Sequence, residues 1–231
     1  MYNVKILRTA HIDCADSVIY KNGDKDSVTT IGCHCFLLCD NDKYYLIDTG
    51  IEDIDTVNRT KSSKADWTRS GEEHTVKEQL GLLGIDCDKI TKVFITHAHY
   101  DHISGIKHFK NAVFYMTKTE YEELYSENNK QKDVLGEVKE FLSESDTVVF
   151  DDELVTDGIK LKLRGGHTKG SMSVETDNIL FTGDTIFVRD NIRKKIPAGF
   201  TEEREVSDRL LDEYLVYPGK IITSHDINEV I

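Results

Sequence analysis

The feature that most constrains this chain is a short apolar run at residues 93–95 that leads directly into a cluster of metal-competent side chains. Within six residues the cluster contains His97, His99, Asp101 and His102. In an extended segment alternate side chains point the same way, so His97 and His99 can share one metal ion. Where the chain turns, Asp101 and His102 can face a second ion. A His-rich surface loop is the simpler alternative, but the full H-x-H-x-D-H pattern after a strand favours a metal site.

Length and composition are those of a compact globular enzyme. The chain has 231 residues, 39% of them hydrophobic, with only two prolines, and we expect one domain spanning residues 1–231. A formal net charge of −13 disfavours nucleic acid as a partner. No apolar stretch approaches the length of a membrane span, and the N-terminal residues do not resemble a signal peptide. We therefore expect a cytoplasmic monomer or homodimer that acts on a small molecule and has no membrane partner.

The five cysteines form no C-x-x-C pair and are expected to be reduced packing residues. Cys33-His34-Cys35 could be imagined as a zinc clamp. It lies in a strand-like alternation, however, and no second cluster follows at the spacing of a zinc finger.

The predicted elements follow the order strands, helices, strands and a final helix. Strands are expected at 4–7, 28–38, 44–47, 93–95, 112–116, 147–150 and in a hairpin at 154–163. Helices are expected after capping boxes at Thr75-x-x-Glu78 and Thr119-x-x-Glu122, and along 134–142 and 206–215. Residues 51–74 are expected to form a long loop, in which Trp67 either packs on the core or belongs to a substrate lid. This order predicts an α/β fold, an αββα sandwich of two mixed sheets with helices on the outer faces.

Later strand ends supply further ligand-type residues. They are His167 after Gly165-Gly166, Asp184 after the apolar run 179–181, and His225 after the apolar pair 221–222. Alone, each would more often be a capping Asp or a structural His. Together with the first cluster they make seven such residues, all where a strand ends. Asp48, also at a strand end, is either a turn cap or a carboxylate that orients a metal-bound histidine.

These motifs resemble the metallo-β-lactamase superfamily: H-A-H-Y-D-H at 97–102, G-H-T-x-G-S at 166–171, F-T-G-D at 181–184 and a terminal His225. The resemblance starts at D-T-G (48–50) and implies the αββα fold. It also implies two ions: a first held by His97, His99 and His167, a second held by Asp101, His102 and His225, and Asp184 bridging both. The family usually carries zinc, although iron, manganese or cobalt also suits nitrogen and oxygen ligands.

The implied chemistry is hydrolysis. Two divalent ions roughly 3.5–4 Å apart can share a water whose pKa falls to about 7, which gives a bridging hydroxide nucleophile at neutral pH. Asp101, with one free carboxylate oxygen, could carry a proton to the leaving group. The substrate class is then an activated carbonyl or a phosphodiester.

Among the branches of the family, the chain is most similar to N-acyl homoserine lactonases, through its compact length and the flanking segments 73–85 and 191–200. Other branches of the family are expected to show different features. Secreted β-lactamases would carry a signal peptide, and flavodiiron proteins would have a Glu in place of His99. Nucleases would need a basic surface, and glyoxalase-II-like thioesterases would have a C-terminal helical domain. A thioester hydrolase or a phosphodiesterase on the same fold is the alternative, and a non-catalytic metal-binding or redox protein is a more distant one.

The chain departs from the lactonase pattern at one position of the expected substrate pocket. Lactonases of this kind place a Tyr three residues after the bridging Asp to bind the substrate carbonyl, and here that position is Phe187. Tyr100 and Trp67 are further candidates for the pocket wall. The segments 51–74 and 189–204 are expected to line the entrance. Four cations there predict a preference for an anionic or polar substrate: Arg189, Arg193, Lys194 and Lys195.

Overall fold

The computed structural model describes residues 1–60 and 65–231, in which two mixed β-sheets pack face to face. The first sheet, in spatial order, consists of β1 (Asn3–Ala15), β2 (Val28–Asp40), β3 (Lys43–Ile47), β4 (Ile90–Phe94), β5 (Val113–Thr117) and β6 (Thr147–Phe150). The second consists of β11 (Lys220–Ile222), β10 (Ile179–Phe181), β9 (Met172–Thr176), β8 (Ile159–Leu163) and β7 (Glu153–Thr156). Strands β3 to β6 are parallel, as are β10 and β11, and the other neighbours are antiparallel.

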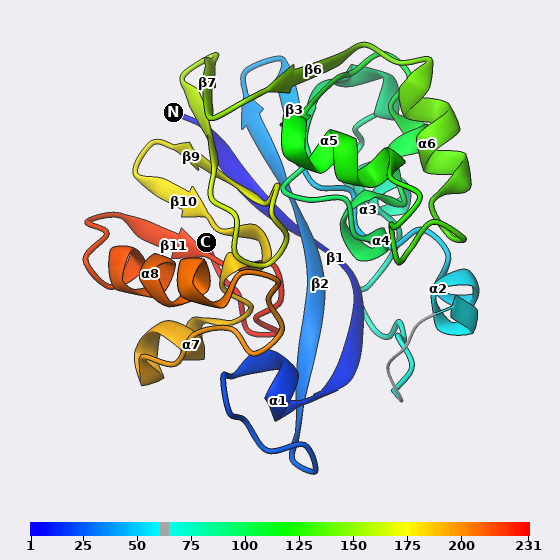
Figure 1. The fold of residues 1–231 in the computed structure, drawn as a ribbon. Coiled ribbons are helices and arrows are strands. Elements are labelled where there is room, and N and C mark those ends of the chain that lie inside the picture. Colours follow the sequence, from blue (N-terminus) through cyan, green and yellow to red (C-terminus); the bar gives the residue numbers. More distant parts are fainter. Residues whose placement is uncertain (61–64) are drawn as a thin grey trace.

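Helices cover the outer faces of both sheets, which confirms the predicted αββα sandwich (Figure 1). The helices are α1 (Asp16–Ile19), α2 (Ile54–Thr60), α3 (Val76–Leu82), α4 (Tyr100–Ile103), α5 (Lys118–Tyr125), α6 (Gly136–Ser143), α7 (Arg189–Lys194) and α8 (Arg204–Leu215). Figure 1 shows α3 to α6 grouped on the side of the first sheet and α7 and α8 on the side of the second. In the described part of the chain no helix has both the length and the apolar character needed to span a bilayer.

The strands pack on both faces because their apolar residues alternate between two cores. In β2, Phe36 and Leu38 belong to the cluster between the sheets, whereas Leu37 belongs to the cluster under the helices of the first sheet. Phe181 and Leu180 of β10 divide in the same way between the inter-sheet cluster and the cluster under α8. Each fully buried side chain of this size contributes about 1.5–3 kcal/mol, and a one-residue slip would exchange the faces, so this pattern fixes the register.

The Cys33-His34-Cys35 segment lies in β2 and follows the same alternation. Cys33 and Cys35 belong to the apolar cluster under the helices, while His34 contacts the backbone carbonyl of Asp226. The three side chains therefore do not form a zinc clamp, and all five cysteines are free, as predicted.

Two predicted segments have different extents in the structure. The first strand, predicted at 4–7, continues as β1 to Ala15 because it pairs with β2 as far as Val28, and α1 follows directly. The predicted loop 51–74 contains α2, and its residues 61–64 lie outside the described residues. Trp67 packs in the apolar cluster under the helices of the first sheet, as a clamp onto the core would.

One of the two capping boxes was placed correctly. Thr75 and Glu78 form the predicted reciprocal box at the start of α3. The box predicted at Thr119 and Glu122 is wrong, because α5 begins two residues earlier with Thr117 as its cap, and the backbone N–H of Glu120 donates to the Thr117 hydroxyl. The sequence offers two overlapping T-x-x-E patterns there, and tertiary contacts select the first.

Candidate metal centre

All seven predicted ligand residues lie at one edge of the sandwich, where strands of both sheets end. His97, His99, Asp101 and His102 follow β4, His167 lies between β8 and β9, Asp184 follows β10, and His225 follows β11. The backbone N–H of Met172 donates to the carbonyl of Thr96 at 2.9 Å, which joins the two sheets beside the site. Segments more than 100 residues apart in sequence thus meet at one point.

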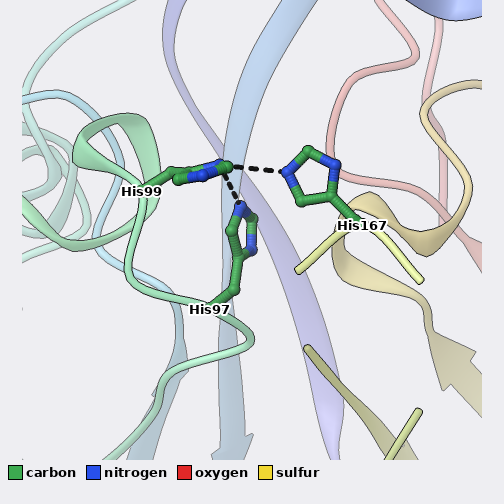
Figure 2. A group of neighbouring side chains, drawn as sticks. All are labelled: His97, His99 and His167. Carbon is green, nitrogen blue, oxygen red and sulfur yellow. Dashed lines mark hydrogen bonds between the residues drawn. The ribbon is translucent and has the colours of Figure 1, made fainter. Parts of the chain in front are cut away.

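The first ligand group, His97, His99 and His167, brings three ring nitrogens together (Figure 2). His99 Nδ1 lies 3.0 Å from His97 Nε2 and 3.0 Å from His167 Nε2. Gly165 and Gly166 precede His167 with φ values of 71° and 86°, a conformation that favours glycine. These glycines allow the sharp turn that points His167 at the site.

The second ligand group consists of Asp101, His102 and His225, and Asp184 lies close to two of its members. Asp101 Oδ2 lies 3.7 Å from Nε2 of both His102 and His225. Asp184 Oδ1 is 3.2 Å from His102 Nε2, and its Oδ2 is 3.0 Å from His225 Nε2 and 3.5 Å from His167 Nε2. Asp184 therefore contacts both groups, as the predicted bridging position requires.

The outward ring nitrogens of four histidines fix which nitrogen faces the centre. His102 Nδ1 donates to Asp48 Oδ2 at 2.8 Å, and His225 Nδ1 donates to the Gly32 carbonyl at 2.6 Å. Nδ1 of His97 and of His167 likewise contacts an oxygen outside the centre. A neutral imidazole carries one N–H, so in its neutral form each of these four rings would direct the lone pair of Nε2 inward, as metal ligation requires.

The donor set fits a bound cation. His99 Nδ1 has either one proton or one lone pair, so it cannot make good hydrogen bonds with both neighbouring nitrogens. Among the described residues, no hydrogen bond satisfies the buried atoms His102 Nε2 and Asp184 Oδ1, which lie 3.2 Å from each other. Such atoms are costly unless something else satisfies them, and a positive ion shared by nitrogen and carboxylate ligands would do so.

Burial and charge act differently on the two groups. Burial lowers the pKa of His97 well below its usual value and lowers that of His167 to about 3, so both rings are neutral. For His102 and His225, burial is outweighed by the carboxylate of Asp184, which raises each pKa. Burial is likewise outweighed for Asp184, where His225 and His102 hold the pKa well below its usual value. Positive charge is thus favoured around Asp184.

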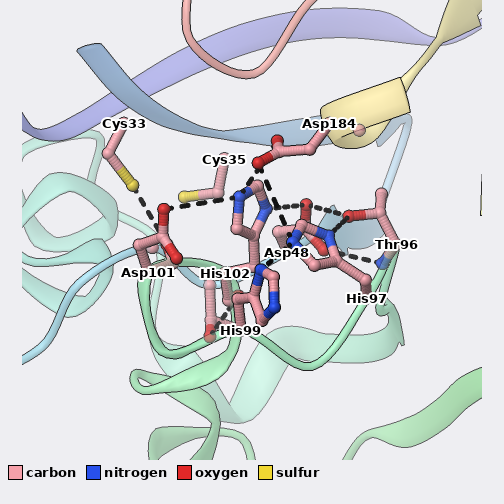
Figure 3. A network of polar contacts seen from close by, with 12 residues as sticks. Cys33, Cys35, Asp48, Thr96, His97, His99, Asp101, His102 and Asp184 are labelled. Atoms are coloured by element: carbon pink, nitrogen blue, oxygen red, sulfur yellow. Dashed lines mark hydrogen bonds and ion pairs between the residues drawn. The ribbon is translucent and has the colours of Figure 1, made fainter. Parts of the chain in front are cut away.

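Asp48 contacts the site through Thr96, which follows β4, and through His102 in α4 (Figure 3). Its carboxylate accepts from the Thr96 backbone N–H at 2.8 Å, from the Thr96 hydroxyl at 2.7 Å and from His102 Nδ1 at 2.8 Å. It is buried and has a positive φ of 59°. Of the two predicted interpretations, these contacts match the carboxylate that orients a histidine.

A cavity of about 390 Å³ lies against His99 and Asp101. Tyr100 lines it, as predicted for a pocket wall. Phe187 is not among the described lining residues, but its ring stacks on His225 with centroids 5.3 Å apart. Trp67 also lies beyond the described lining, with its ring 6.4 Å from that of His225.

The charge of the cavity differs from the sequence prediction. Its described lining includes Glu123, Asp133 and Glu202, with Lys130 as the one cation. The four predicted cations lie elsewhere. Arg189 pairs with Glu229, Arg193 and Lys194 pair with Asp190, and Lys195 ends α7. The basis for preferring an anionic substrate is therefore absent.

Sequence reasoning missed two side chains that contact the ligand-bearing segments. Glu120 accepts from the Ala98 backbone N–H at 2.7 Å and from the Thr168 hydroxyl at 2.6 Å. Gln131 accepts from the Tyr100 backbone N–H at 2.7 Å. The T-x-x-E pattern starting at Thr117 was a visible signal for Glu120, but in that pattern the Glu normally caps its own helix.

Comparisons with known proteins agree with this geometry. A family model described as the metallo-beta-lactamase superfamily matches residues 28–223. An N-acyl homoserine lactonase of Bacillus thuringiensis is 26% identical over 209 residues, covering 84% of this chain and 81% of the relative. A probable metallo-hydrolase of Methanocaldococcus jannaschii is 31% identical over 170 residues, covering 65% of this chain and 78% of that protein.

Solved structures show the same fold. An N-acyl homoserine lactone hydrolase with N-hexanoyl-L-homoserine bound at its catalytic metal centre superposes with a TM-score of 0.79 at 20% identity, covering 97% of this chain and 93% of that one. A probable metal-dependent hydrolase of Staphylococcus aureus also gives a TM-score of 0.79, at 17% identity, covering 97% and 89%. With a family match over most of its length, this chain belongs to the metallo-beta-lactamase superfamily and is a metal-dependent hydrolase.

Proposed function

We propose that this chain is a dinuclear hydrolase that opens a lactone, or a similar carboxylic ester of a small molecule, in the manner of N-acyl homoserine lactonases. The observation that carries the proposal is the convergence of two ligand groups with Asp184 in contact with both. The similarity to lactonases over 84% of the chain supports the reaction class. We propose zinc as the ion, and iron, manganese or cobalt would suit the same nitrogen and oxygen ligands.

The roles of the residues follow from their positions. The first ligand group would hold one ion, the second would hold another, and Asp184 would bridge them. Two bound divalent ions would polarise the substrate carbonyl and lower the pKa of water. Asp101 would hold and return the proton, because it lines the cavity, its side chain is 18% exposed, and only its Oδ2 is close to the histidines.

The cavity favours an uncharged substrate. Its acidic lining would repel a phosphodiester or another anion, whereas a lactone or ester carries no charge before it is cleaved. Phe187 cannot donate a hydrogen bond to the substrate carbonyl as a Tyr would, so we expect measurable but modest lactone hydrolysis.

The test combines metal analysis with a substrate panel. Protein purified without chelator is analysed for bound metal, and then assayed on short- and long-chain acyl homoserine lactones, a carboxylic ester, a thioester and a phosphodiester. The same purification from cells that do not express the chain serves as the control for contaminating hydrolases. We expect two ions per chain and a higher kcat/KM on a lactone or ester than on the phosphodiester.

Two results would contradict the proposal in different ways. Absence of metal, with no uptake on reconstitution, would remove the dinuclear centre. Two bound ions with rapid phosphodiester hydrolysis and no lactone or ester hydrolysis would keep the centre and remove the lactonase assignment.

A further inference from the structure

The first turn of α5 contacts both segments that supply the first ligand group. Glu120, only 3% exposed, accepts a hydrogen bond from the backbone N–H of Ala98 at Oε1 and from the hydroxyl of Thr168 at Oε2. Ala98 lies between His97 and His99, and Thr168 follows His167. A single carboxylate therefore ties together the two segments that hold the three imidazoles.

Independent steric evidence shows how closely the His167 segment is seated on this helix. A Cβ added at Gly170 would lie 2.6 Å from the Cα of Glu120, closer than real Cβ contacts, so this position has no room for a side chain. The hydroxyl of Thr117 donates to the carbonyl of Gly170 at 2.6 Å. The start of α5 and the loop that contains Thr168 and Gly170 are thus held together by two hydrogen bonds and one close packing contact.

The position of Glu120 differs from that of an ordinary third residue of a helix. Such a Glu usually reaches back to the backbone N–H of its own cap, at the surface. Glu120 instead turns inward, where burial raises its pKa and its two hydrogen bonds oppose that rise. Burying a carboxyl group is costly, so its placement calls for a compensating use beyond filling space.

We propose that Glu120 is a positioning residue of the metal centre: it sets the separation between the His97–His99 pair and His167 and so determines the affinity of the first ligand group for its ion. The inference rests on the proposed dinuclear function. Residues outside a metal's immediate ligands typically change metal affinity by about 10–100-fold when they orient those ligands.

The experiment compares Glu120→Leu, Glu120→Gln and the matched control Glu122→Gln, an exposed acid on the same helix. Metal-free protein is titrated with Zn²⁺ in competition with a chromophoric chelator, which gives dissociation constants for both ions. The Co²⁺ absorption spectrum reports the ligand geometry. Thermal unfolding of the metal-free proteins separates stability from affinity.

We expect Glu120→Leu to lower the affinity for one ion by about 10–100-fold and to leave the affinity for the other nearly unchanged. Glu120→Gln should retain most of the affinity, because its amide oxygen can accept from Ala98 and its NH₂ group can donate to Thr168. The control should match wild type. Turnover lost in Glu120→Leu should return when free Zn²⁺ is raised, which loss of a purely structural contact would not produce.

Thr168→Val provides a second variant in case Glu120→Leu does not fold. It replaces the hydroxyl by a methyl group and should lower the affinity for the same ion by a smaller factor. Unchanged affinity for both ions in every folded variant, even with lower thermal stability, would overturn the inference while the dinuclear function stands. A wild type that binds no metal would instead overturn the proposed function itself.

Discussion

Replacing Asp48 by Asn should weaken the metal centre without straining the backbone. Asp48 has a φ of 59°, in the left-handed region that Asn also adopts readily. Its two carboxylate oxygens accept three hydrogen bonds, two from Thr96 and one from His102 Nδ1. An amide of the same shape offers one oxygen and one NH₂ group. Whichever way the amide turns, a donor of Thr96 or His102 faces another donor.

The two orientations of the amide have different costs. If its oxygen keeps the Thr96 N–H, the NH₂ group faces His102 Nδ1, and the ring avoids the clash by carrying its proton on Nε2. That nitrogen points at Asp184 and could then no longer bind a metal ion. If the amide turns over, the buried Thr96 N–H loses its acceptor, which costs about 1–3 kcal/mol.

The expected magnitudes follow from these two costs. Loss of the group that orients a histidine ligand should reduce metal affinity about 10–100-fold, or about 1.4–2.8 kcal/mol. An unpaired buried donor should lower the Tm of the metal-free protein by about 2–12 °C for a domain of this size. Free-metal-buffered dialysis with elemental analysis measures the affinity, and circular dichroism measures the Tm. Two ions held by Asp48→Asn as tightly as by wild type would refute the tautomer argument.

Three further predictions concern the ligands and the pocket. Asp184→Ala and His102→Ala should each reduce kcat on the best substrate far more than they reduce the Tm, and near-native turnover in both would rule out the dinuclear mechanism. Chelator treatment of wild type should abolish hydrolysis, and Zn²⁺ or Co²⁺ should restore it; hydrolysis that survives complete metal removal, checked by elemental analysis, would contradict a metal-dependent reaction. Phe187→Tyr should raise kcat/KM on acyl homoserine lactones, up to about 10²–10³-fold if the hydroxyl reaches the carbonyl in the transition state, and an unchanged value would mean that it does not.

The ligand-bearing strand ends could be predicted because the signal for each is local. A buried strand is visible as a short apolar run, and in β10 the run Ile179–Phe181 leads within three residues to Asp184. The same holds for β4 and its histidines. Strands of one sheet often end at a common edge, so side chains that follow them have a physical reason to meet.

Glu120 could not be predicted, because its environment comes from distant segments. In sequence it is one acid among several on a helix that would be expected to face solvent. Its burial depends on Gly170, whose missing side chain lets a loop 50 residues later approach the helix. Local patterns carry no information about that approach, and the two overlapping T-x-x-E patterns made the wrong helix start equally acceptable.

The charge of the pocket could not be predicted from local sequence patterns either, and it bears on the choice of substrate. Arg189, Arg193 and Lys194 look like an anion-binding cluster in sequence, but in the fold each pairs with a carboxylate. Glu123 and Glu202, which do line the cavity, have no distinguishing pattern in the sequence. Because a lactone gains a negative charge only when its ring opens, an acid-lined cavity would admit the neutral substrate and repel the carboxylate product. If the chain has the proposed function, this charge distribution would favour hydrolysis of a neutral ester and release of its product over binding of an anionic substrate.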